Sequence, residues 1–558
     1  MLRIDMLNLW LTHQVFSAET KDEVRRIKQD EREVLNRFGS ELSFGTGGLR
    51  GILGAGTNRM NTYTVARATQ GLAEYIKSQN GKSVAIAYDS RNCSREFAMV
   101  AAGVLAYNGL QACCFNRIMP TPILSFSIRE IKCDAGIVIT ASHNPAQYNG
   151  YKVYGSDGCQ ITDHAASSIT AFIDKVSYAD LVWTNEQDAR LSGKLQDIPE
   201  EIYNAYIEKT LSCRMEDYTT PFSLRIVYTP LHGTGLEPIR DVLKRMGVTS
   251  CIEVAEQCTP DGNFPTCPKP NPEIKETLRL AIETAKKENA DIVAATDPDC
   301  DRIGIAARNA SGEYQILTGN EVGLLLTEYL LYRKIEKGVM PKDSFVVKTI
   351  VTSDLCFPIA SRYGVGVREV LTGFKYIGET IGQLEKSGME HQYLFGFEES
   401  CGYLAGTHVR DKDGVMACML IVDMAQYYSN QGHTLLETLE KLYYTYGHMR
   451  NQLLNYDIED TLPMEKMHSI MNRLRDNPPQ IIGESTTAVI RDYRTGLDGL
   501  PISDVLSFEN NIGDKAIVRP SGTEPKIKVY LSVKGNSQFD TEKKLKEITE
   551  QVDNWIKS

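Results

Sequence analysis

The chain has 558 residues, 42% of them hydrophobic and 24% charged, with a formal net charge of −11. Its length suits roughly three or four globular domains of about 100–200 residues each. The negative charge argues against a nucleic-acid or membrane-surface partner. The thirteen cysteines lack paired metal-site spacing and indicate reduced thiols. Because the chain has neither a long apolar run nor a signal-type N-terminus, we expect a soluble cytoplasmic protein.

The first 43 residues predict amphipathic helices, which we interpret as a structural extension. A glycine-rich loop with a single arginine follows, Phe44-Gly-Thr-Gly-Gly-Leu-Arg-Gly51. It has neither the Lys-Ser/Thr ending of a Walker loop nor the spacing of a dinucleotide fingerprint. A tight turn explains the glycines equally well, but Arg50 on a backbone that a ligand can approach would suit a phosphoryl group.

Three similar blocks of alternating strands and helices come next. Their predicted strands are 83–88, 134–139, 224–228, 251–254, 291–295, 344–348, 367–370 and 393–395, and their helices are 95–107, 237–246, 273–288, 355–363 and one after 374. This alternation predicts βαβ units and mostly parallel sheets, and the repeated order resembles an internal triplication. The stretch after about 455 differs, with a helix, strands, a polar loop, a strand at 528–533 and a charged terminal helix. It predicts a smaller α+β domain.

The first block ends in Thr140-Ala-Ser-His-Asn-Pro145, directly after an apolar run typical of a buried strand. Ser142 should therefore lie on a loop at the carboxyl end of a strand, where open α/β sheets place ligands. A serine that accepts and donates a group needs a proton acceptor, a fixed backbone and a cation. His143, the Asn-Pro turn and Lys152 offer these three. The alternative is an ordinary turn, and the lack of Gly-x-Ser-x-Gly disfavours a hydrolase elbow.

The second block ends in Thr296-Asp-Pro-Asp-Cys-Asp-Arg302, where carboxylates alternate at Asp297, Asp299 and Asp301. An extended loop can bring all three to one hard cation, and oxygen-only ligation with few carboxylates suits Mg²⁺. An EF-hand is excluded, because arginines stand where it needs its glycine and its glutamate. Arg302 could reach the same phosphoryl oxygens, with an ordinary salt bridge as the alternative.

Two later loops also carry polar groups. In Gly396-Phe-Glu-Glu-Ser-Cys-Gly402, Glu398 and Ser400 stand two apart, so on an extended segment they would face the same way and could grip vicinal sugar hydroxyls. A polar surface turn explains them as well. Near the C-terminus, an arginine, two hydroxyls and a glycine predict a phosphate cradle formed by Arg519, Ser521, Gly522 and Thr523.

Thr140-Ala-Ser-His-Asn-Pro145, followed by Tyr148-Asn-Gly-Tyr-Lys152, resembles the phosphoserine loop of the α-D-phosphohexomutases, the phosphoglucomutase/phosphomannomutase family. The other three loops match the same family in the same order, over essentially the whole chain after about residue 40. The resemblance implies a phosphorylated Ser142, whose phosphate supplies the fourth Mg²⁺ ligand beside the three aspartates. It also implies that Arg50 belongs to the active site.

The resemblance further implies that the loop with Glu398 and Ser400 selects the sugar and that Thr372 makes a second substrate contact. The cradle would hold the non-reacting phosphate. The run 408–414 is similar to the glucose-type members, where Lys412 meets substrate. The branch with dual mannose/glucose specificity has a histidine where this chain has Gly402, which weakens a mannose assignment. The second general acid/base stays open between Lys412 and His408.

We therefore expect an α/β protein with three similar mixed α/β domains plus a smaller C-terminal α+β domain around a central cleft. The predicted boundaries are an N-terminal extension at 1–43 and domains at 44–210, 211–325, 326–450 and 451–558. Its expected partner is a small phosphosugar, and it would be a monomer or a homodimer without nucleic-acid or membrane partners.

The parts suggest phosphoryl transfer on a phosphosugar, with no nucleotide loop to bind ATP. The expected reaction interconverts glucose 1-phosphate and glucose 6-phosphate with Mg²⁺ and a bound glucose 1,6-bisphosphate. Residues 45–61 resemble the phosphoglucomutases and the related phosphopentomutases, so a pentose phosphate is the runner-up and mannose phosphate a further alternative. A non-catalytic phosphosugar-binding relative and a phosphosugar phosphatase are the rivals from other classes.

Overall fold

The computed structural model describes residues 3–45, 47–218, 222–458, 462–521 and 525–557. The chain forms two compact units. The first comprises residues 1–317, 377–390 and 402–429, and the second comprises 318–376, 391–401 and 430–558. Within the described ranges, no helix combines the length and the apolar character needed to cross a membrane.

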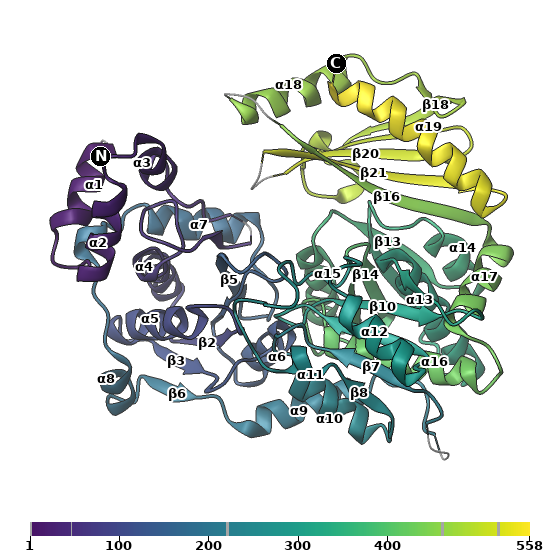
Figure 1. The fold of residues 1–558 in the computed structure, drawn as a ribbon, viewed down its shortest axis with the longest axis horizontal. Helices are drawn as coiled ribbons and strands as arrows, with labels where there is room; N and C mark the ends of the chain where they lie inside the picture. The colour runs from purple at the N-terminus through teal and green to yellow at the C-terminus, as the bar shows by residue number, and fades with distance from the viewer. Residues whose placement is uncertain (1–2, 46, 219–221, 459–461, 522–524, 558) are drawn as a thin grey trace. The chain divides into compact units, whose positions relative to one another are not determined.

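The first unit begins with three short helices that pack beside α4 (Thr62–Ser78) (Figure 1). They are α1 (Arg3–Thr12), α2 (Ala18–Ile27) and α3 (Glu31–Phe38). Trp10 of α1 is fully buried, with its ring centroid 4.4 Å from Phe16, 5.6 Å from Phe38 and 5.5 Å from Tyr63 of α4. The predicted helices of this segment are present, and aromatic packing attaches them to the first α/β layer.

The first sheet has the strand order β1-β5-β4-β2-β3-β6. Its strands are β1 (Leu49–Ile52), β2 (Ser83–Tyr88), β3 (Gln111–Cys114), β4 (Ala135–Ile139), β5 (Tyr148–Gly155) and β6 (Leu195–Asp197). Strands β4, β2, β3 and β6 are parallel, whereas β5 runs antiparallel to both β4 and β1. Helices α5 (Ser94–Tyr107) and α6 (Thr121–Glu130) pack on β2 and β4. Strand β5 was not predicted, and it turns the serine segment into a hairpin.

The remaining helices around this sheet are α7 (Asp163–Ile173), α8 (Glu186–Leu191) and α9 (Glu200–Leu211). The second sheet has the order β11-β10-β9-β7-β8, with strands β7 (Ile226–Thr229), β8 (Cys251–Glu253), β9 (Ile292–Thr296), β10 (Ile303–Arg308) and β11 (Tyr314–Leu317). Strands β7, β8 and β9 are parallel, and β10 returns antiparallel after the aspartate loop. Its helices are α10 (Leu236–Arg245), α11 (Ala255–Cys258) and α12 (Arg279–Glu288), and the unit also contains β15 (Gly402–Ala405) and α16 (Gly414–Ser429).

Helix α12 begins at Arg279, whereas the sequence predicted a start near residue 273. Two side-chain hydrogen bonds hold the intervening residues in turns. The Asn271 side chain accepts from the Glu273 N–H at 3.0 Å, and the Thr277 hydroxyl donates to the Lys269 carbonyl at 2.8 Å. Such local bonds compete with helix formation.

In the second unit, β12 (Phe345–Thr349) pairs in parallel with β13 (Gly366–Val370) and β14 (Tyr393–Glu398). The helices here are α13 (Gly319–Glu336), α14 (Cys356–Arg362) and α17 (Leu435–Tyr446), and α15 (Phe374–Lys386) begins in this unit. The last sheet is antiparallel throughout and has the order β16-β21-β20-β19-β18-β17. Its strands are β16 (His448–Asp457), β17 (Ile481–Ile482), β18 (Ser485–Asp492), β19 (Leu506–Asn510), β20 (Lys515–Pro520) and β21 (Lys526–Gly535).

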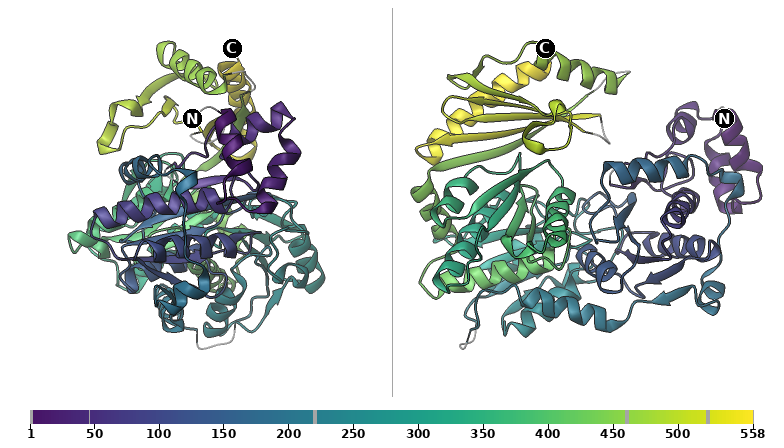
Figure 2. Two further views of the ribbon diagram at one scale, coloured as in Figure 1. Left: turned by 90° about the vertical axis from the view of Figure 1, so that its left-hand side faces the viewer. Right: turned by 180° about the vertical axis from the view of Figure 1, so that it is seen from behind.

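Helices α18 (Pro463–Asp476) and α19 (Gln538–Lys557) cover one face of this last sheet (Figure 2). Their buried apolar residues, including Met471 and Val552, join the sheet residues Phe508 and Val529 in one core cluster. The segregation of helices and antiparallel strands is that of an α+β domain, as the sequence predicted.

Candidate active site

Ser142 lies directly after β4, in a left-handed backbone conformation with φ of 51°, and is 2% exposed. Its N–H donates to the Thr140 hydroxyl at 2.9 Å. Its own hydroxyl donates to Asp297 Oδ2 at 2.7 Å and lies 3.2 Å from His143 Nδ1. The predicted nucleophile and the aspartate loop, 155 residues apart in the chain, are therefore in direct contact.

Two further predicted residues flank the serine. Arg50 stands on β1 opposite Gly150 of β5, and its Nη1 donates to Asn144 Oδ1 at 3.3 Å. Two residues before Arg50 only glycine fits, because a Cβ at Gly48 (φ 84°) would lie 1.8 Å from the Tyr151 carbonyl oxygen. Burial lowers the pKa of His143, and the positive charges of nearby arginines lower it further. The imidazole is therefore neutral and binds a proton only weakly.

Lys152 stands on β5 opposite Val138 and is therefore part of a strand rather than a loop. Its Nζ donates to Asp299 Oδ2 at 2.9 Å and lies 3.7 Å from Asp301 Oδ2. Burial disfavours the ammonium, but the two carboxylates outweigh burial and raise the pKa of Lys152 above its usual value. With these partners, the group holds its proton firmly.

Asp297, Asp299 and Asp301 are all buried, and one carboxylate oxygen from each lies within 4.8 Å of the others. Burial and the two neighbouring carboxylates raise the pKa of Asp297 well above its usual value. Asp299 Oδ1 and Asp301 Oδ1 accept no hydrogen bond from the described part of the chain. Buried carboxylate oxygens with unused lone pairs are costly, and they fit a hard divalent cation such as Mg²⁺.

The aspartate loop is held from two sides. The Thr121 N–H and hydroxyl at the start of α6 donate to the Asp299 backbone and side chain at 2.9 and 3.0 Å. The Thr234 N–H and hydroxyl both donate to the Pro298 carbonyl at 2.9 Å. Neither threonine was predicted from the sequence. Their one sequence signal is a position near the end of a buried segment.

Arg302 donates its backbone N–H to Asp297 Oδ1 at 3.0 Å. Its guanidinium forms long ion pairs, 3.7 Å to Asp301 and 3.6 Å to Glu273. The structure therefore contains the ordinary salt bridge that the sequence left open, while keeping the guanidinium next to the aspartate loop.

Lys412 joins the same cluster, with Nζ 3.2 Å from Asp301 Oδ2 and 3.0 Å from Asp411 Oδ1. Tyr154, two residues after Lys152 on β5, donates its hydroxyl to Asp411 Oδ2 at 2.7 Å. Neither the tyrosine nor Asp411 was predicted. His408, the other candidate for the second acid/base, instead has its ring against Phe126 and Tyr206.

In the second unit, Glu398 ends β14 and is 5% exposed, and its Oε1 accepts from the Gly373 N–H at 2.9 Å. This bond places the predicted Thr372 beside Glu398, and the Thr372 hydroxyl is buried without a hydrogen-bond partner among the described residues. Ser400 follows on the same loop. Helix α13 supports the loop closely, because a Cβ at Gly319 would lie 2.2 Å from the Glu399 carbonyl.

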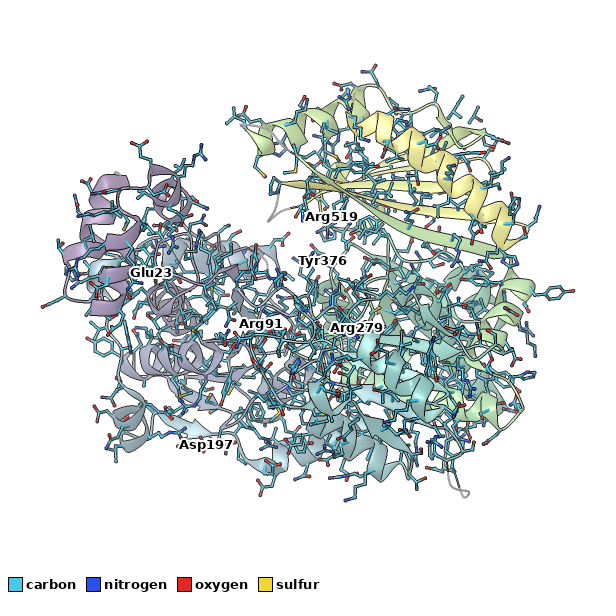
Figure 3. The ribbon with its side chains drawn as sticks, in the orientation of Figure 1. Glu23, Arg91, Asp197, Arg279, Tyr376 and Arg519 are labelled. Carbon is cyan, nitrogen blue, oxygen red and sulfur yellow. The ribbon has the colours of Figure 1, made fainter. Side chains whose placement is uncertain are left out.

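Arg519 lies on β20 opposite Lys528 of β21 and is labelled in Figure 3. The loop between the two strands begins with Ser521, whose N–H donates to the Lys526 carbonyl at 2.8 Å. The other two predicted cradle residues, Gly522 and Thr523, lie outside the described residues. Within the second unit, the loop that follows Glu398 and the loop that begins at Ser521 thus each start at the end of a strand.

Three domain families match the chain in succession. They are phosphoglucomutase/phosphomannomutase alpha/beta/alpha domain I at residues 41–180, domain II at 203–312 and domain III at 318–446. Among curated proteins, a phosphoglucomutase of Staphylococcus aureus (strain N315) is 37% identical over 522 residues, covering 91% of this chain and 92% of its own.

Solved structures show the same fold. A putative phosphomannomutase from Thermus thermophilus is 22% identical with a TM-score of 0.68, over 92% of this chain and 99% of its own. The Aspergillus fumigatus N-acetylphosphoglucosamine mutase, solved with GlcNAc-6P and magnesium, is 14% identical with a TM-score of 0.53, over 97% and 99%. The three family matches and the extent of the Staphylococcus aureus similarity show that this chain belongs to the phosphoglucomutase/phosphomannomutase family, the α-D-phosphohexomutases, and is a mutase.

Proposed function

We propose that this mutase is a phosphoglucomutase, which interconverts glucose 1-phosphate and glucose 6-phosphate through a phosphorylated Ser142 and a bound glucose 1,6-bisphosphate. The observation that carries the proposal is the 2.7 Å hydrogen bond from the Ser142 hydroxyl to Asp297, inside a buried group of three carboxylates. A serine in an ordinary turn would not be expected to donate to a carboxylate of this buried group. The name shared by relatives 36–37% identical to this chain supports glucose as the sugar.

The proposed reaction has two half-steps. In the first, the bond between phosphorus and Ser142 Oγ breaks and a bond forms to the free hydroxyl of the substrate; that hydroxyl loses its proton to a base, and Ser142 Oγ gains a proton. The resulting bisphosphate turns over in the cleft. In the second, Ser142 Oγ loses its proton and takes the other phosphoryl group, and the released sugar oxygen gains a proton.

The ligands proposed for Mg²⁺ are Asp297, Asp299 and Asp301, with an oxygen of the serine phosphate as the fourth. The ion supplies electrostatic stabilisation of the transferring phosphoryl group. Arg50 and Arg302 flank the serine and the aspartates, and their guanidinium groups would offset charge on the equatorial oxygens.

Proton transfer at the substrate is assigned to residues around the serine. His143 lies 3.2 Å from Ser142 Oγ and is close enough to exchange a proton with it, while its lowered pKa makes the imidazole a weak base. Lys152 holds its proton next to Asp299, so its ammonium is suited to offset negative charge on the transferring group. For the second acid/base we favour Lys412 over His408, because Lys412 contacts Asp301 whereas the histidine packs among aromatic rings. Acid/base catalysis of this kind contributes about 10²–10⁴-fold in rate.

The loops of the second unit are assigned to substrate binding in this proposal. Glu398, Ser400 and Thr372 would bind sugar hydroxyls. The Glu398 carboxylate accepts from the backbone N–H of Gly373, the residue after Thr372, and the Thr372 hydroxyl has no hydrogen-bond partner among the described residues. The non-reacting phosphate would be held by the loop of Arg519, Ser521, Gly522 and Thr523. Each of the four loops belongs to one of the proposed domains at 44–210, 211–325, 326–450 and 451–558.

Phosphomannomutase activity is disfavoured by the surroundings of Gly402. A Cβ at this position would lie 2.3 Å from Lys412 Cδ, so the histidine of the dual-specificity branch would displace the lysine. A pentose phosphate stays the runner-up. A non-catalytic relative is opposed by the presence of the serine and all three aspartates in one cluster.

The test is an assay of glucose, mannose and ribose 1-phosphates, with and without Mg²⁺, for the wild type and Ser142→Ala. We expect glucose 1-phosphate to be preferred, activity to require Mg²⁺, and the alanine variant to be inactive. Robust mutase turnover by Ser142→Ala would exclude the phosphoserine route. Steady release of inorganic phosphate would instead indicate a phosphatase.

A further inference from the structure

Arg91 follows β2, is 3% exposed and is labelled in Figure 3. Its two terminal nitrogens donate to four backbone carbonyls of that loop. Nη2 reaches the carbonyls of Ser142 and Asn144 at 2.5 Å each, and Nη1 reaches those of Pro145 and Tyr148 at 3.0 Å each. One side chain therefore gathers the whole loop from the serine to the start of β5.

Besides the loop carbonyls, Asp89 and Phe264 hold the guanidinium. Asp89 forms a fully buried ion pair with Arg91 Nε at 3.3 Å, and its other oxygen accepts from the Arg91 N–H and the Ser94 hydroxyl at 2.9 and 2.7 Å. The ring of Phe264, between α11 and α12 of the same unit, has its centroid 4.9 Å from the guanidinium carbon. A buried charge with this many partners is fixed in place rather than mobile.

Four carbonyl oxygens that converge on one point repel each other unless a cation with several donors lies between them. Only a guanidinium offers five N–H donors in a planar fork, whereas an ammonium is a compact point donor. The loop also keeps Ser142 in a left-handed conformation that non-glycine residues seldom adopt. The same backbone position directs the serine hydroxyl at Asp297.

We propose that Arg91 is a positioning residue for phosphoryl transfer. It fixes the serine loop from behind, so that Ser142 Oγ meets the aspartate cluster, without touching substrate itself. This inference rests on the proposed phosphoserine mechanism and adds a residue to it. A misplacement of a reacting atom by about 1 Å can cost about 10²-fold in rate, which sets the size of the expected effect.

The chain offers a matched control in Arg67. This arginine is also buried, donates to a carbonyl (Val176, 2.9 Å) and a carboxylate (Glu41, 2.6 Å), and lies over an aromatic ring (Tyr178, 5.2 Å). None of these partners belongs to the serine loop. Arg67→Lys therefore reproduces the structural cost of replacing a buried guanidinium without disturbing Ser142.

The experiment compares Arg91→Lys, Arg91→Ala and Arg67→Lys in the full-length protein with Mg²⁺. For Arg91→Lys we expect kcat to fall about 10²-fold, with the KM for glucose 1-phosphate nearly unchanged, since substrate is not touched. The ³¹P resonance of phospho-Ser142 should shift or broaden in this variant. Arg67→Lys should keep the wild-type kcat and resonance. Added guanidinium ion should restore part of the kcat of Arg91→Ala and leave the wild type unaffected.

A folded Arg91→Lys with wild-type kcat and an unchanged ³¹P resonance would overturn the proposal. So would equal losses in Arg91→Lys and Arg67→Lys, because the effect would then be general destabilisation. If Arg91→Ala does not fold, the lysine variant decides alone. An inactive or unphosphorylated wild type would count against the proposed function instead, so the two failures can be told apart.

Discussion

The three buried carboxylates predict that two similar substitutions have opposite effects on stability. Asp297 accepts hydrogen bonds from Ser142 and the Arg302 backbone but has no ion pair among the described residues, and it faces Asp299 and Asp301. Asp299 has the same acidic neighbours but also Lys152 at 2.9 Å. Without Mg²⁺, the charge of Asp297 should therefore destabilise the fold, whereas the charge of Asp299 should stabilise it.

The magnitude follows from Coulomb's law. Two like charges 4.8 Å apart repel by about 3.5 kcal/mol at an effective dielectric constant of about 20. Asp297→Asn removes two such repulsions, at most about 7 kcal/mol because the raised pKa of Asp297 lets protonation relieve part of them in the wild type, and weakens two hydrogen bonds by about 1–2 kcal/mol each. Loss of the attraction to Arg302 reduces the gain further, so we expect a net stabilisation of about 2–3 kcal/mol. Asp299→Asn leaves the buried Lys152 without its closest partner, so it should not stabilise the protein at all.

The assay is thermal unfolding in EDTA followed by titration with Mg²⁺. Asp297→Asn should unfold at a higher temperature than the wild type in EDTA, and Asp299→Asn at the same or a lower temperature. Mg²⁺ should stabilise the wild type most, because binding to the folded state adds to its stability. Both variants should lack mutase activity. If both unfold at the same raised temperature, or if Asp297→Asn is destabilised in EDTA, the assignment of repulsion to Asp297 is wrong.

Three shorter predictions concern other groups. Lys348→Met removes a fully buried ammonium that donates to Asp354 at 2.9 Å and Glu369 at 2.7 Å. The substitution should lower the free energy of unfolding, measured with denaturant, by about 3–5 kcal/mol. A loss near zero would contradict these buried ion pairs. Burial lowers the pKa of His408 to about 3, so below pH 6.5 the unfolded chain binds a proton that the folded chain does not. The free energy of unfolding of the wild type should therefore fall by up to about 1.4 kcal/mol per pH unit below 6.5. His408→Phe should largely remove this loss when unfolding is measured from pH 8 to 4.5. Glu398→Gln should lower kcat/KM for glucose 1-phosphate by about 10–100-fold through lost hydroxyl recognition, and unchanged kinetics would exclude that role.

The strands and helices that the sequence predicted best are those with long apolar runs between breakers. Strand β2 occupies residues 83–88 as predicted, and β4 and β9 lie within one residue of expectation. The apolar pattern is clear there because both faces of these strands are buried. The start of α12 was missed because Asn271 and Thr277 hold turns by side-chain bonds, which periodicity does not report.

The site could be predicted where chemistry is concentrated in one short segment, as in the aspartate loop. It could not be predicted where the working group depends on tertiary contacts. Arg91 stands in the short motif Asp89-Ser-Arg91 at the end of a buried strand, which is a weak signal in the sequence. Its importance is visible only from its hydrogen bonds to four carbonyls of the serine loop. Tyr154 gave no signal, because its partner Asp411 is 257 residues away.

Strand β5 shows why the arrangement of these groups is specific. Residues two apart on a strand face the same side of the sheet, so Lys152 and Tyr154 point the same way. The lysine contacts Asp299 of the aspartate loop, while the tyrosine contacts Asp411, which in turn holds Lys412 beside Asp301. One strand, paired with the strand that ends at Ser142, thus fixes both lysines relative to the nucleophile. A one-residue slip of β5 against β4 would turn both side chains to the opposite face, so the register of this hairpin sets the geometry of the site.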